Sequence, residues 1–315
     1  MMTTDKLQKD FSSGLSIFLS NYPESNLFEP IRYLLSLGGK RIRPLLALSV
    51  SNAEGATSEE AMPASLAVEL FHNFTLMHDD IMDNAPLRRG KVTVHEKYSE
   101  NAAILSGDAL FTAAYQALEF ANPEHLPQLL RLLNKTSMEV CEGQQLDLDY
   151  ESLDDVTQEM YLEMIRLKTS VLLAASCSMG AICAGADDER VQLWYEFGEK
   201  LGLAFQLQDD YLDTFGLEKS TGKKVGGDIL ADKKTFLHIH SSSAKELPSA
   251  SGLSDDDKID LIKTAMKDRG SDIAAKNKMT AYSENARKAL ELLDLGSSLK
   301  IWFEELLFSV TQRVS

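Results

Sequence analysis

The sequence of 315 residues is poor in cysteine, glycine and proline. Its 3 cysteines, Cys141, Cys177 and Cys183, form neither a CxxC pair nor an even-numbered framework. This argues against a disulfide scaffold and favours a reducing, cytoplasmic location. Glycine (18) and proline (8) are few, and the alternation typical of half-buried strands is scarce. The low glycine and proline content, together with the scarcity of strand-like alternation, argues against an all-β protein.

The sequence also lacks positive charge and a clear membrane-spanning run. A formal net charge of −16 argues against binding to nucleic acid or to anionic lipid, because both need clustered cations. Charged residues from Asp5 to Asp10 interrupt any signal-peptide core. Residues 169–186 carry no charge, but they are dominated by Ala, Gly, Ser and Cys. We therefore expect a buried helix there and no membrane span.

Apolar residues recur instead at helical spacing in long blocks, which predicts an all-α protein. The hydrophobic fraction of 44% suits a large core. No repeat or linker divides the chain, so we predict one helical domain over residues 1–315. Residues 241–257, rich in Ser and Asp, are expected to form a surface loop that ends in a helix cap. The blocks are 66–82, 102–120, 126–145, 160–184, 191–215, 257–266 and 299–310.

Three aspartates, Asp79, Asp80 and Asp83, follow a strongly apolar block. On a helix Asp79 and Asp83 share one face, in line with His72. Two charges 4 Å apart near a protein surface repel by about 4 kcal/mol, so such a cluster needs cations or open solvent. Oxygen ligands alone suit Mg²⁺. A solvated helix end explains a single cluster equally well.

A second cluster has the same spacing: Asp209, Asp210 and Asp213. Gln206, Asp210 and Asp213 share a helix face. Two such helices facing each other could hold several Mg²⁺ ions, which would stabilise the charge that grows on a departing diphosphate. The repetition favours a metal site over two solvated helix ends.

Cationic residues lie beside the acidic motifs in an otherwise acidic chain. Arg binds phosphate oxygens in bidentate fashion and Lys supplies a point charge. Each patch alone is explained by a solvated turn, but their co-location favours diphosphate binding. The patches are Lys40–Arg43, Arg88–Lys91, Lys168 with Thr169, Lys223 with Lys224, and Lys233.

Together these motifs resemble the trans-type (head-to-tail) prenyl diphosphate synthases over nearly the full chain. The resemblance implies an all-α isoprenoid synthase fold, a single large helical bundle around a central cavity, and a homodimer. The matching segments are GGKRIRP (38–44), HNFTLMHDDIMDNAPLRRG (72–90), GQQLD (143–147), KT (168–169), FQLQDDYLD (205–213) and TGKKVGGD (221–228).

The resemblance also implies roles for single residues. Isopentenyl diphosphate is expected at Lys40, Arg43, His72 and Arg89, and the allylic diphosphate at Arg88, Lys168, Lys223 and Lys233. The family has one lysine where this sequence has Lys223 and Lys224, and either could match it. Around Lys233, residues 232–236 lack the glycine and proline that many relatives carry.

The metal-binding and catalytic roles follow from the same resemblance. Three Mg²⁺ ions are expected when both diphosphates are bound, with Asp79, Asp83 and Asp209 as ligands and Asp80, Asp210 and Asp213 in supporting positions. Thr169 and Gln206 are expected near the allylic carbon, and Gln144 and Asp147 behind the metal site. The expected catalytic set is Asp79, Asp83, Lys168, Thr169, Gln206 and Asp209.

The expected reaction condenses isopentenyl diphosphate with dimethylallyl, geranyl or farnesyl diphosphate, giving the twenty-carbon geranylgeranyl diphosphate. The residues five and four positions before Asp79 are Phe74 and Thr75. The resemblance links a fifteen-carbon product to aromatics at both positions or to a two-residue insertion, so one aromatic and no insertion favour twenty carbons, with a farnesyl diphosphate synthase as the alternative. A terpene cyclase would need a different second motif and no second diphosphate site. A non-catalytic subunit would have degraded acidic motifs, whereas both are intact.

Overall fold

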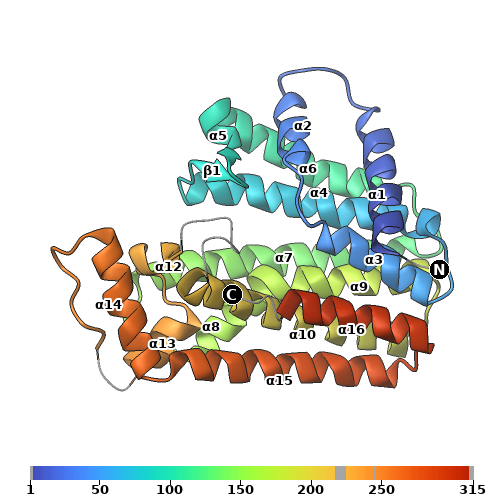
Figure 1. Ribbon diagram of the computed structural model, residues 1–315. Helices are drawn as coiled ribbons and strands as arrows, with labels where there is room; N and C mark the ends of the chain where they lie inside the picture. The colour runs from blue at the N-terminus through green and yellow to red at the C-terminus, as the bar shows by residue number, and fades with distance from the viewer. Residues whose placement is uncertain (1–2, 217–224, 244–245, 312–315) are drawn as a thin grey trace. The chain divides into compact units, whose positions relative to one another are not determined.

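The computed structural model describes residues 3–216, 225–243 and 246–311, most of them in helices (Figure 1). The strands in this part of the chain form a single short hairpin, β1 (Leu87–Arg88) with β2 (Lys91–Val92). The predicted all-α class is confirmed. The three cysteines are free thiols.

The chain forms two compact units. Unit 1 comprises Met1–Lys135 and Ala175–Tyr195, and unit 2 comprises Thr136–Ala174 and Glu196–Ser315. Their boundaries fall within three helices, α7 (Leu126–Ser152), α9 (Val171–Cys183) and α10 (Asp188–Phe215). That residues 1–315 act as one domain stays a prediction.

Unit 1 is built on α4, which packs against α3 and along α6 (Figure 1). A capping box begins α4: the Glu60 N–H donates to Thr57 Oγ1, and the Thr57 N–H donates to Glu60 at 2.8 Å. The apolar face of α4, including Leu70 and Phe71, is fully buried. The other elements of unit 1 are α1 (Thr4–Leu19), α2 (Glu29–Ser36), α3 (Ile42–Ala53), α4 (Ser58–Met82), α5 (Val94–Lys97) and α6 (Glu100–Leu118).

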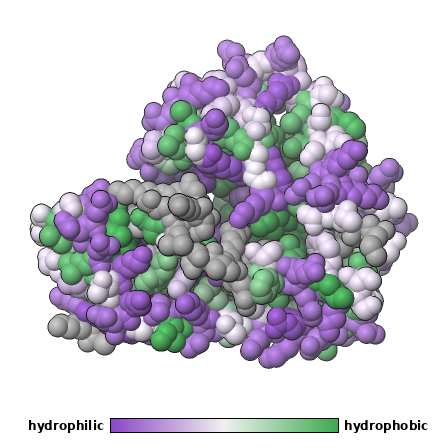
Figure 2. Space-filling view, viewed as in Figure 1, coloured by the Kyte–Doolittle hydropathy of each residue, from purple (hydrophilic) through white to green (hydrophobic). Residues whose placement is uncertain are grey.

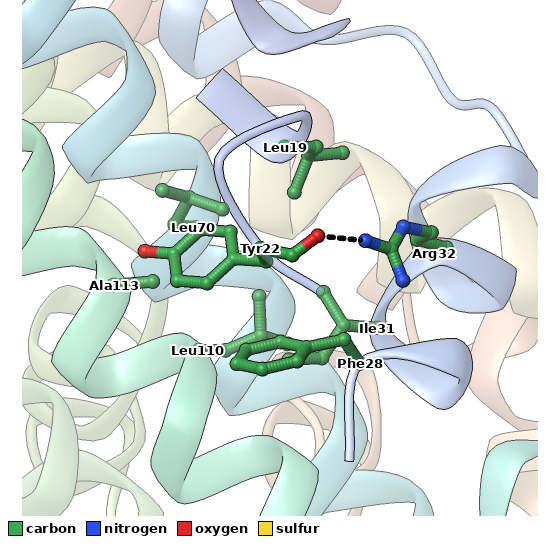
Figure 3. Close-up of a pocket in the computed structure, with 8 residues that line it drawn as sticks. All are labelled: Leu19, Tyr22, Phe28, Ile31, Arg32, Leu70, Leu110 and Ala113. Carbon is green, nitrogen blue, oxygen red and sulfur yellow. Dashed lines mark hydrogen bonds between the residues drawn. The ribbon is translucent and has the colours of Figure 1, made fainter. Parts of the chain in front are cut away.

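The turn between α1 and α2 is fixed by two hydrogen bonds, of which Figure 3 shows the one between Arg32 and Tyr22. Nη2 of Arg32 donates to the carbonyl oxygen of Tyr22 at 2.7 Å, and the Tyr22 hydroxyl donates to Gln116 at 2.5 Å. Leu70, Leu110 and the Tyr22 ring line a small cavity (Figure 3). These contacts hold the N-terminal segment against α4 and α6.

Unit 2 packs α15 (Ser271–Leu292) against α13 (Phe236–Ser242), α14 (Asp255–Asp268) and α16 (Ser297–Thr311). Its core includes Tyr161, Leu207 and Phe236. The predicted loop 241–257 is shorter than expected: Ser241 and Ser242 belong to α13, and Asp255–Asp257 begin α14, while residues 246–254 lie outside helices. The predicted cap is present, since the Ser254 hydroxyl accepts from the Asp257 N–H. The remaining elements are α8 (Gln158–Ile165), the π-helical turn η1 (Arg166–Ser170) and α12 (Gly227–Leu230).

One continuous helical run among the described residues, Gln158–Cys183, has the length and hydropathy of a membrane span. Of its most apolar window, 83% is buried inside the protein, as expected for a core helix. Hydrophilic side chains cover most of the face shown in Figure 2, with hydrophobic ones in separate patches.

Candidate active site

The first acidic motif lies at the C-terminal end of α4. Asp79 and Asp80 are in its last turn, and Asp83 is the C-cap. The helix dipole places partial negative charge at this end, which adds to the repulsion among the carboxylates. A cation is therefore favoured here.

Arg88, on β1, neutralises part of this motif. Its Nε and Nη2 donate to Oδ1 of Asp80 at 2.9 and 2.6 Å, and Nη2 lies 3.9 Å from Asp79 Oδ2. Asp80 is only 1% exposed, and burial raises its pKa while the Arg88 hydrogen bonds oppose the rise. Asp80 thus supports the motif from inside, while Asp83 is exposed. Arg88, predicted to bind the allylic diphosphate, contacts the acidic residues.

The residues predicted to hold isopentenyl diphosphate include a close pair. Nη1 of Arg43, at the start of α3, lies 3.1 Å from Nε2 of His72 on α4. Burial, and next the positive charges of Arg43 and Arg89, hold the pKa of His72 well below its ordinary value. The imidazole is therefore neutral, and Nε2 accepts from the guanidinium. Lys40 is exposed on the loop that precedes Arg43.

Arg89 joins the same group through a glycine turn. Its Nη1 donates to the carbonyl oxygen of Gly38, and its guanidinium lies over Gly39. A Cβ on Gly39 would come within 2.7 Å of that guanidinium, and Gly39 has a φ of +126°. The glycine is thus required by both the conformation and the close approach of Arg89.

Arg41, which received no role from the sequence, anchors this loop from inside. It is in the left-handed region with φ at 51° and donates to Glu69 and to the carbonyl oxygen of Leu35. Glu69 is 2% exposed and also accepts from Asn73 at 2.8 Å. The sequence did contain one sign of this anchor: Glu69 is a single acidic residue within the apolar run of α4, and a buried carboxylate needs a cationic or hydrogen-bonding partner.

In unit 2, the π-helical turn η1 carries Lys168 and Thr169. Two glycines allow neighbouring helices to approach it: a Cβ on Gly143 of α7 would lie 2.3 Å from the Lys168 nitrogen, and one on Gly202 of α10 would lie 2.6 Å from Ser170 Cα. Nζ of Lys168 lies 2.5 Å from Asp147, and the Thr169 hydroxyl donates to Gln206 Oε1 at 3.0 Å. Widened turns of this kind often occur at functional sites.

The second acidic motif occupies the last two turns of α10. Asp210 is 6% exposed; it accepts from the Tyr161 hydroxyl on Oδ2 and from Gln206 Nε2 on Oδ1 at 3.0 Å. Burial, and next the charge of Asp228, raise the pKa of Asp210 to about 8. Asp209 is partly exposed. The sequence did not single out Tyr161, which lies in an apolar block without a distinctive neighbour.

Asp213 orders the chain beyond α10. Its Oδ2 accepts the backbone N–H of Asp228 at 2.9 Å, and its carbonyl oxygen accepts that of Gly226 at 2.7 Å. These bonds hold the start of α12. Lys233 follows α12 and is partly exposed, as is Gln144 on α7, whereas Lys223 and Lys224 lie outside the described residues.

The donor set fits a divalent cation. Both acidic motifs lie at C-terminal helix ends, where the dipole adds negative charge, and their donors are carboxylate oxygens. Within the described residues no three His, Cys, Asp or Glu side chains form a ready-made metal cage. The carboxylate oxygens suit Mg²⁺, which takes few protein ligands and completes its shell with water and phosphate oxygens.

Comparison with known proteins identifies clear relatives. The sequence profile described as polyprenyl synthetase matches residues 24–283. A short chain isoprenyl diphosphate synthase of Methanocaldococcus jannaschii is 45% identical over 219 residues, which cover 69% of this chain and 67% of the relative. A geranylgeranyl diphosphate synthase of Saccharolobus solfataricus is 37% identical over 92% of this chain and 91% of its own.

A solved structure agrees with the sequence comparison. A geranylgeranyl pyrophosphate synthase is 41% identical and superimposes with a TM-score of 0.94 over 100% of both chains. The predicted isoprenoid synthase fold is confirmed.

Proposed function

Because the chain belongs to the polyprenyl synthetase family and is a prenyltransferase, we propose that it condenses isopentenyl diphosphate with an allylic diphosphate to make geranylgeranyl diphosphate. The observation that carries this proposal is on α4, where His72 of the cationic group precedes Asp79 of the acidic motif by two turns, about 10 Å. One diphosphate can thus be bound directly by cations and another near it through metal.

Separate groups of residues are proposed to bind each substrate and the metal. Arg43, His72 and Arg89, with Lys40, hold and orient isopentenyl diphosphate. The cations Arg88, Lys168, Lys223 and Lys233 bind the allylic diphosphate. Asp79 and Asp83 of unit 1, and Asp209 of unit 2, would hold Mg²⁺, with three ions proposed in all, and the metal would supply positive charge to the leaving group.

The bond changes balance without a further reactant. The allylic C–O bond breaks, and the electron pair leaves with diphosphate. The double bond of isopentenyl diphosphate then attacks the allylic carbon, which the dipoles of Thr169 and Gln206 stabilise. The proton lost from the condensed product passes to the released diphosphate.

The test is a purified-protein assay with labelled isopentenyl diphosphate and dimethylallyl, geranyl or farnesyl diphosphate, with Mg²⁺ or with a chelator. A twenty-carbon product that needs Mg²⁺ is expected. A fifteen-carbon product would instead assign a farnesyl diphosphate synthase, and a cyclic hydrocarbon a terpene cyclase. Activity only in the presence of an active synthase partner would assign a non-catalytic subunit.

We also propose that the protein is a cytoplasmic homodimer. On α6, the side chains of Ile104 and Leu105 are 38% and 59% exposed, an apolar pair that a second copy would cover. Light scattering should give twice the chain mass of 34.9 kDa. A mass of one chain at micromolar concentration would contradict the dimer, and Leu105→Asp should weaken it.

A further inference from the structure

Tyr161 on α8 places a single polar atom inside an apolar cluster of unit 2. Its side chain is 3% exposed and packs in the same core as Leu207 and Phe236. Burial, and next the charge of Asp210, raise the pKa of the phenol well above its ordinary value, so it keeps its proton. The Tyr161 hydroxyl donates to Oδ2 of Asp210.

Two further hydrogen bonds connect Asp210 to Gln206 and Gln206 to Thr169. Oδ1 of Asp210 accepts from Gln206 Nε2 at 3.0 Å, and Gln206 Oε1 accepts from the Thr169 hydroxyl at 3.0 Å. The two ends of an amide are nearly equal in size, so its partners decide which end faces where. Oδ1 of Asp210 is the acceptor here, which fixes Nε2 toward Asp210 and Oε1 toward Thr169.

The carboxylate itself needs a second anchor. Asp228 and Asp209 bring further negative charge toward Asp210, so hydrogen bonds have to hold it in place. The Gln206 bond restrains only one oxygen, and the carboxylate could turn about its axis if the other had no donor. The Tyr161 hydroxyl supplies that donor.

We propose that Tyr161 is a positioning residue: through Asp210 it orients the Gln206 amide, so that Thr169 gives its proton to Gln206 and turns its oxygen lone pairs toward the reacting allylic carbon. This rests on the proposed function. If the Gln206 amide were reversed, its NH₂ group, which carries partial positive charge, would face Thr169 and the developing cation. This would raise the barrier, because a fixed dipole stabilises a developing charge only when its end of opposite sign faces that charge.

The first test is Tyr161→Phe, which removes only the hydroxyl. Single-turnover condensation should slow about 10- to 100-fold, the loss typical when a residue that supports a metal-site side chain is removed. The KM for isopentenyl diphosphate, set by Arg43 and His72, should stay within about threefold because uniform binding is untouched. The matched control is Tyr150→Phe: Tyr150 packs at the edge of the same cluster but is not part of this hydrogen-bond chain, so the change should alter neither value.

A double-mutant cycle separates positioning from a merely structural effect. In a Thr169→Val background, Tyr161→Phe should slow single turnover by less than about threefold, since residues that act as a unit are not additive. Full additivity, or a Tyr161→Phe enzyme that turns over at the wild-type rate, overturns the proposal. A wild-type protein without condensation would overturn the proposed function itself.

A second pair of variants covers the case in which Tyr161→Phe does not fold. Asn is neutral at every pH, so adding Tyr161→Phe to Asp210→Asn cannot leave a buried carboxylate without its donor. The proposal expects equal single-turnover rates, within about threefold, for Asp210→Asn with and without Tyr161→Phe. A further loss of tenfold or more, by the same reasoning, shows that Tyr161 acts by another route and overturns it.

Discussion

Nη1 of Arg43 lies 3.1 Å from Nε2 of His72, and this contact joins the first turn of α3 to α4. A neutral imidazole beside a guanidinium is an acceptor, so His72 holds Arg43 in place and adds no charge of its own. The positive charge offered to a diphosphate at this point thus comes from the arginines and Lys40.

We predict that His72 makes folding sensitive to acid. The pKa of His72 in the folded protein is below its unfolded value of about 6.5, so the unfolded chain takes up the proton first as pH falls. The contribution to stability is complete above about pH 6.5 and is lost below it, by about 1.4 kcal/mol per pH unit. Urea unfolding at pH 7.5 and 5.5 measures it.

His72→Gln should remove this part of the pH dependence. The part due to His238, whose pKa burial also lowers, should remain in both proteins. Equal losses of stability in the wild type and in His72→Gln between the two pH values would contradict the prediction.

Arg43→Ala should mainly raise the KM for isopentenyl diphosphate, about 10- to 100-fold for the loss of a charged hydrogen-bonding group. Its contacts persist in the ground and transition states alike, so kcat should change little. Lys40→Ala should act in the same direction. Steady-state kinetics with each substrate varied decides the matter, and a rise in KM for the allylic substrate alone would show that the two sites are reversed.

Asp79→Ala should lower turnover more than about 100-fold, beyond the range of residues that only support a metal ligand. The melting temperature without metal should stay the same or rise, because a repulsion at the end of α4 is relieved. The contrast is Asp80→Asn, which loses the Arg88 ion pair and should lower stability by about 1–3 kcal/mol. Near-normal turnover of Asp79→Ala at saturating Mg²⁺ would remove Asp79 from the metal site.

The sequence predicted the acidic helix ends and the Arg43–His72 group because short motifs carried both signals. It could not predict the partners that hold them. Arg41 and Glu69 lie 28 positions apart, and only folding shows that the arginine turns inward. Tyr161 resembles any core tyrosine until Asp210 is placed beside its hydroxyl.

The sequence also showed no sign of the π-helical turn at Lys168, because residues 169–186 carry no charge and a shift of the helical phase there leaves the apolar pattern unchanged. Gly143 begins the GQQLD segment, but only the structure shows why a glycine is needed there: α7 packs so closely against this turn that a side chain would collide with it.

Gly143→Ala should therefore damage both folding and catalysis. The added Cβ would lie 2.3 Å from the backbone nitrogen of Lys168, so α7 or the turn has to move. Overpacking of this kind costs about 1–3 kcal/mol, and kcat should fall because Lys168 and Thr169 shift with the turn. Chemical denaturation and kinetics measure both effects.

The control is Gly296→Ala, where a new Cβ meets no atom within 4 Å. Its free energy of unfolding should stay within about 0.5 kcal/mol of the wild type. If Gly143→Ala behaved like this control, the close approach would have no energetic role.

Product length should depend on the aromatic residues before the first acidic motif. The Phe74 ring lies 5.5 Å from Phe71, 5.2 Å from Phe111 on α6 and 4.9 Å from His78, between centroids. Thr75 instead donates to the carbonyl oxygen of His72. If the growing hydrocarbon runs toward α6, the layer of Phe71, Phe74 and Phe111 stops it.

Phe74→Ser, or the double change with Phe71→Ser, should open this layer and lengthen the product by one or more five-carbon units. Phe71 is fully buried, so the double variant must first be shown to fold, because truncating a buried Phe costs about 3–5 kcal/mol. Phe308→Ser, at a side chain 59% exposed on α16, is the control and should leave the length unchanged. Chromatography of products made with excess isopentenyl diphosphate gives the answer. An unchanged length distribution from soluble, active Phe74 variants would mean that these rings are ordinary packing between α4 and α6, and that another helix stops chain growth.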